Sequence, residues 1–99
     1  MERPIFKSSG TPVEQLDTPA LVVDLDVLQQ NINTVHSFFI DLQVKLRPHV
    51  EGHLCPTIAH MQLDAGGTSG GLSVMTVGQA ESFVQTGFRD IFIANEIVT

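Results

Sequence analysis

The sequence predicts an α/β fold in which short strands and amphipathic helices alternate along one chain. Four short apolar runs begin near residues 21, 44, 72 and 91. The segments between them carry helix-capping signals and apolar side chains spaced three or four residues apart, and the connections are short. This alternation is typical of βαβ units, in which right-handed crossovers join parallel strands. Alternation alone does not distinguish an open doubly wound sheet from part of a barrel.

The first strand and helix follow an irregular arm. Residues 1–19 are rich in proline and lack periodicity, whereas residues 20–23 form an apolar run typical of a buried strand. A helix is expected to begin near Val27, because Asp26 and Gln29 have the spacing of a capping box. Its apolar face recurs every three or four residues. The residues of this face are Leu28, Ile32, Val35, Phe39 and Leu42.

The next two units repeat the pattern. Residues 44–50 predict a second strand, and Pro56 opens a helix that is expected to end at Gly66. Residues 72–75 predict a third strand. Thr76 and Gln79 then repeat the capping-box spacing.

The helix that Thr76 opens is expected to end at Gly87, and residues 91–94 predict a fourth strand. We therefore divide the chain into an irregular arm, residues 1–19, and one α/β domain, residues 20–99.

The second strand carries ionisable side chains on one face. Side chains alternate between faces along a strand, so Lys45, Arg47, His49 and Glu51 share one face and apolar residues share the other. Parallel strands are normally apolar on both faces. The polar row therefore indicates either a wet cavity or an edge strand with a solvated face. Glu51 would lie at the C-terminal end of the strand, where parallel α/β proteins place ligands.

Four segments of the chain carry recognisable motifs: residues 17–26, 46–56, 76–81 and 90–96. Together they resemble the D-threonine aldolase / D-serine dehydratase family. Residues 17–26 resemble the family's opening, and residues 46–56, LRPHVEGHLCP, resemble its L-R-P-H-x-K-[TA]-H-[KR]-x-P pattern. Residues 76–81 and 90–96 resemble its V-G-E-A-E and D-I-x-I-A-N-E segments. The resemblance covers nearly all of residues 16–99. It implies the N-terminal part of an alanine racemase-like (β/α)8 barrel, the TIM-barrel architecture.

The resemblance also implies a pyridoxal-phosphate-dependent lyase that acts on D-β-hydroxy amino acids. In the family, the lysine of R-P-H-x-K holds the cofactor as a Schiff base, and the pyridoxal ring acts as an electron sink. Arg47, His49 and His53 match motif positions, which implies that they bind the cofactor. The family's divalent metal site lies near the C-terminus of full-length chains, and we predict no metal ligands within these residues.

Glu51 stands at the position of the Schiff-base lysine. A carboxylate cannot condense with an aldehyde, and Gly52 and Leu54 also depart from the pattern. Lys45 lies on the same strand face but roughly 20 Å away, at the wrong end. Because a barrel of this kind needs about 250 residues, we expect a non-catalytic fragment of the family. The alternative is a non-catalytic relative that binds pyridoxal phosphate or has a regulatory role.

Composition excludes several other functions. Eleven acidic residues against five basic ones give a net charge of −6, which argues against binding to nucleic acid or to an anionic membrane surface. No apolar run is long enough to span a membrane, and the single cysteine fits a reducing cytoplasm. A partial barrel exposes a strand edge, which favours self-association.

The remaining histidines, the cysteine and the glycine-rich stretch are expected to have structural roles and not to bind ligands. His36 and His60 fall within predicted helices and are expected to be half-exposed. Cys55 is expected to be a small packed residue. The glycine-rich stretch from residue 66 to residue 71 follows a helix and precedes a strand, so it predicts a turn and not a phosphate loop.

Overall fold

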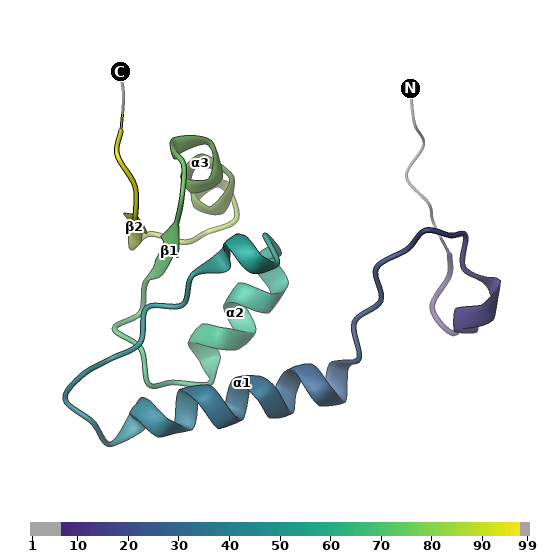
Figure 1. The fold of residues 1–99 in the computed structure, drawn as a ribbon, viewed down its shortest axis with the longest axis horizontal. Helices are drawn as coiled ribbons and strands as arrows, with labels where there is room; N and C mark the ends of the chain where they lie inside the picture. Colours follow the sequence, from purple (N-terminus) through teal and green to yellow (C-terminus); the bar gives the residue numbers. More distant parts are fainter. Residues whose placement is uncertain (1–6, 98–99) are drawn as a thin grey trace.

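The computed structural model describes residues 7–97 of the 99-residue chain. Figure 1 shows α1 lying across the base of the molecule, α2 above it, and α3 packed beside two short strands. None of the helices in this range combines the length and the apolarity needed to cross a lipid bilayer. The elements, in chain order, are η1 (Val13–Gln15), α1 (Leu25–Ile40), η2 (Val50–Gly52), α2 (Pro56–Asp64), β1 (Leu72–Val74), α3 (Val77–Gln85) and β2 (Ile91–Ile93).

The sheet is parallel, as predicted. β1 pairs with β2 so that Leu72 lies opposite Ile91 and Val74 lies opposite Ile93. The helix α3 connects the two strands, which makes β1-α3-β2 a βαβ unit. The sequence-based prediction of alternating strands and helices is confirmed for this part of the chain.

The predicted second strand, residues 44–50, is extended but irregular. It makes two isolated parallel bridges, between Leu46 and Thr68 and between His49 and Ser73. The Leu46 N–H donates to the Gly67 carbonyl at 2.9 Å. Pro48, two residues further on, has no N–H with which to continue the ladder, so the segment adjoins β1 without forming a continuous strand.

The prediction of a first strand at residues 20–23 is wrong in this structure. The segment is extended and exposed, and Leu21 reaches 103% relative exposure. A strand is stabilised by pairing and by side-chain packing with its neighbours, more than by its own backbone preference. Among residues 7–97, no other segment lies alongside residues 20–23, which lead away from the body of the molecule at the N-terminal end of α1 (Figure 1).

Helix α1 begins at Leu25, two residues earlier than predicted. Its N-cap is Asp24 and not Asp26, because the Asp24 carboxylate accepts a hydrogen bond from the Val27 N–H at 3.1 Å. Asp26 instead lies in the first turn, where a negative charge interacts favourably with the helix dipole. The buried side of the helix is also narrower than predicted, since Val35 is 50% exposed.

The predicted capping box of α3 is present in a shifted form. The Thr76 Oγ1 accepts a hydrogen bond from the Gln79 N–H at 3.1 Å. The Gln79 Oε1 in turn accepts from the N–H of Met75, the residue before the cap, at 2.9 Å. Gly87 follows the helix with a φ of 101°, which confirms the predicted end of α3.

Helix α2 begins at Pro56, as predicted, and its last residue is Asp64. The turn that follows packs tightly against two other segments. Gly67 has a φ of 72°, and a Cβ there would lie 2.3 Å from the backbone oxygen of His36. A Cβ at Gly71 would lie 2.1 Å from the Arg47 Nη1. The glycines of this turn therefore allow the close approach of α1 and of the Arg47 side chain.

The hydrophobic core lies where β1 meets α3, α2 and η2. The rings of Phe83 and Phe88 contact each other edge to face at 5.6 Å. His60 is exposed, as a residue on the outer face of α2, but its ring stacks on Phe88 at 4.2 Å. The buried apolar residues of this core are Val50, Ala59, Leu72, Val74, Phe83 and Phe88.

The close packing at Gly67 and Gly71 predicts that alanine at either position destabilises the fold. We expect Gly67→Ala and Gly71→Ala each to lower the free energy of unfolding by about 1–3 kcal/mol, the usual effect of overpacking. Gly78→Ala is the matched control, because Gly78 lies within α3 and the nearest neighbouring atom to an added Cβ is the Thr76 Oγ1, at 3.9 Å. We expect this control to gain about 0.5–1 kcal/mol. Urea unfolding followed by far-UV circular dichroism measures all three, and equal midpoints would contradict the prediction.

Candidate functional site

The candidate site residues lie on one short segment that runs beside β1 and then turns into α2. The turn is η2 (Val50–Gly52), and the side chain of Val50 anchors it in the core with 0% exposure. The Leu54 N–H donates to the Val50 carbonyl at 2.7 Å and tightens the turn. The polar residues on either side of Val50 are thereby held at the C-terminal end of the extended segment.

Arg47 ties three segments together. Its Nη1 and Nη2 donate to the two carboxylate oxygens of Asp90 at 2.9 and 3.3 Å, and Nη1 also donates to the carbonyl of Leu72 at 3.2 Å. This two-pronged geometry suits the planar guanidinium. The side chains of Arg47 and Asp90 are 30% and 54% exposed, so the ion pair contributes no more than about 1 kcal/mol. In this structure the guanidinium has a structural role, and cofactor binding by Arg47 stays a prediction.

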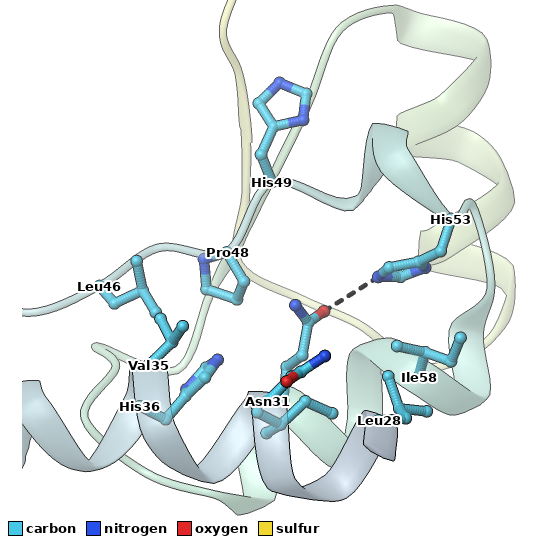
Figure 2. Close-up of a pocket in the computed structure, with 11 residues that line it drawn as sticks. Leu28, Asn31, Val35, His36, Leu46, Pro48, His49, His53 and Ile58 are labelled. Carbon is cyan, nitrogen blue, oxygen red and sulfur yellow. Dashed lines mark hydrogen bonds between the residues drawn. The ribbon is translucent and has the colours of Figure 1, made fainter. Parts of the chain in front are cut away.

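His49 is exposed and caps the turn. Its Nδ1 accepts a hydrogen bond from the Glu51 N–H at 3.3 Å. A nitrogen that accepts carries no proton, so this contact fits the tautomer that has its proton on Nε2. Figure 2 shows the imidazole pointing away from Pro48 and Leu46.

His53 has a different environment from His49. Its Nδ1 accepts from the Cys55 N–H at 2.9 Å, and its Nε2 lies 3.0 Å from the Gln62 Oε1. The first contact places the ring proton on Nε2, which then donates to Gln62. His53 therefore fixes the entry of the chain into α2, and Figure 2 shows this contact as a dashed line.

The histidines on either side of Glu51 lie apart from each other. The two imidazoles that neighbour Glu51 stand apart on separate sides of the η2 turn (Figure 2). Across residues 7–97, no group of three histidine, cysteine, aspartate or glutamate side chains is placed to hold a metal ion.

Glu51 is exposed on the η2 turn, and its backbone N–H is the donor to His49. Within residues 7–97, its carboxylate makes no hydrogen bond or ion pair. The Nζ of Lys45, at the opposite end of the segment, donates to the carbonyls of Phe39 and Ile40 at 3.0 and 2.9 Å. A cation there satisfies the last carbonyls of α1. Lys45 therefore binds the C-terminal end of α1 and not the end of the extended segment where Glu51 lies.

A cavity of about 360 Å³ lies between α1, the extended segment and α2. Figure 2 shows that apolar side chains of α1 and of the extended segment alternate with polar ones around it. Its lining residues are Leu28, Asn31, Ile32, Val35, His36, Leu46, Pro48, His49, His53, Ile58 and Gln62.

His36 is the residue of this cavity whose environment was not foreseen. We expected a half-exposed side chain, but His36 is only 2% exposed and its Nδ1 donates to the Gly66 carbonyl at 2.9 Å. The reason is its position one helical step of four residues after buried Ile32, on the same face of α1. The four-residue spacing could be recognised in the sequence. The carbonyl acceptor could not, because it belongs to the turn after α2, 30 residues along the chain.

The buried contact of His36 predicts a graded response to substitution. His36→Leu leaves the Gly66 carbonyl without its donor, and we expect a loss of about 1–3 kcal/mol in unfolding free energy. His36→Asn can place an amide N–H where Nδ1 stands, so it should lose less. Urea unfolding of both variants measures the difference, and an Asn variant no more stable than the Leu variant would count against a role for this hydrogen bond.

The chain is similar in sequence to enzymes that act on D-amino acids. No protein-family model matches the chain. The chain is 39% identical to a D-threonine aldolase of Arthrobacter sp over 89 residues, which are 90% of this chain and 23% of that protein. It is 40% identical to the D-threo-3-hydroxyaspartate dehydratase of Delftia sp. (strain HT23) over 79 residues, which are 80% of this chain and 20% of that protein.

A solved structure agrees with these sequence matches. The crystal structure of D-threonine aldolase from Filomicrobium marinum matches with a TM-score of 0.81 and 38% identity, over 88% of this chain and 23% of that chain. The chain therefore spans about a fifth of the length of the relatives that it matches.

The fold and the site define the class of protein. The chain is part of a parallel α/β protein, and its polar site residues lie at the end of the extended residues 46–50. Within that class, the chain belongs to the family that contains D-threonine aldolase and D-threo-3-hydroxyaspartate dehydratase. The resemblance stated from the motifs is thereby confirmed.

Proposed function

We propose that residues 20–99 form the N-terminal part of a (β/α)8 barrel of the pyridoxal-phosphate-dependent D-amino-acid lyase type, preceded by an arm at residues 1–19. The 99-residue chain by itself has no lyase activity in this proposal. The substrates that the relatives' names indicate, D-threonine and 3-hydroxy-D-aspartate, are β-hydroxy amino acids. A small D-amino acid of that class is the substrate proposed for the family context of this chain.

The observation that carries the proposal is the glutamate at position 51. The family pattern places a lysine there, at the C-terminal end of the extended segment, where parallel α/β proteins bind their ligands. Glu51 is exposed at that end. Its carboxylate has no amine to condense with the aldehyde of pyridoxal phosphate, so covalent attachment through this residue is chemically excluded.

The other basic residues near this position do not compensate. Lys45 holds the end of α1 through two backbone carbonyls. The Arg47 guanidinium is engaged by Asp90. The residues around position 51 therefore do not fit a covalently held pyridoxal phosphate.

The barrel proposal rests on the order of the parallel segments. Residues 46–49 adjoin β1 through two parallel bridges, and β1 pairs with β2 in parallel. This is the side-by-side sequential order of a (β/α)8 barrel, which needs eight strands and about 250 residues to close. The described segments supply only a part of that ring.

Reduction with borohydride tests the loss of covalent chemistry. We expect the native chain, incubated with pyridoxal phosphate and reduced, to carry no stoichiometric pyridoxyl group at any position. Glu51→Lys should acquire one at residue 51, because an exposed amine then stands at the motif position. Peptide mapping by mass spectrometry locates the group, and Lys45→Arg in the Glu51→Lys background is the matched control that should not change the labelling.

Two outcomes of this experiment would contradict the proposal. Stoichiometric labelling of Lys45 in the native chain would show that another lysine has taken over. Saturable binding of pyridoxal phosphate to the native chain in equilibrium dialysis, without borohydride, would favour the alternative of a non-catalytic cofactor-binding or regulatory relative.

A further inference from the structure

We draw no further inference here: the strongest candidate, the cavity between α1, the extended residues 46–50 and α2, adjoins the edge at which the proposed barrel seats its own first strand, and nothing among residues 7–97 shows what else would occupy it.

Discussion

The contact that organises this structure is the insertion of the Arg47 side chain between β1 and the residue that precedes β2. One guanidinium binds the Leu72 carbonyl and both carboxylate oxygens of Asp90. It thereby holds three consecutive parallel segments in place where Pro48 has interrupted the backbone ladder. The turn before β1 accommodates this side chain only because position 71 carries no Cβ. Together with the backbone bonds of Leu46 and Pro48 and the buried Val50 side chain, that contact sets the alignment of residues 46–50 and the position of the η2 turn.

Because Arg47 fixes the segment at its start and Val50 anchors it in the core, position 51 is structurally unconstrained. The Glu51 side chain is exposed and has no partner within residues 7–97. Surface substitutions at such positions usually change stability by less than about 0.5 kcal/mol. In the function proposed above, a lysine-to-glutamate difference at this position would remove the reactive amine without a cost to the fold. The rest of the motif can keep its structural roles, with His53 holding the entry to α2 and Arg47 holding the parallel segments.

Local signals in the sequence were sufficient for the elements whose stabilising contacts are local. The start of α2 at Pro56, the cap of α3 at Thr76 and the turn at Gly87 were predicted because each is decided within a few residues. The cap at Asp24 was missed because two aspartates two residues apart both satisfy the N-cap preference. The structural partner of Arg47 could not be predicted, since Asp90 lies 43 residues away. The burial of His36 has the same explanation, because its acceptor lies 30 residues along the chain.

The failed strand prediction at residues 20–23 has a physical cause. Strand-forming residues indicate that a segment can pair, but pairing requires a second edge within reach. In this structure residues 20–23 are exposed, and no segment within residues 7–97 pairs with them. The sequence pattern therefore indicated a strand-forming tendency but not the neighbouring strand that would satisfy it. An unpaired apolar strand and an unpaired edge in the same chain each carry an association hazard.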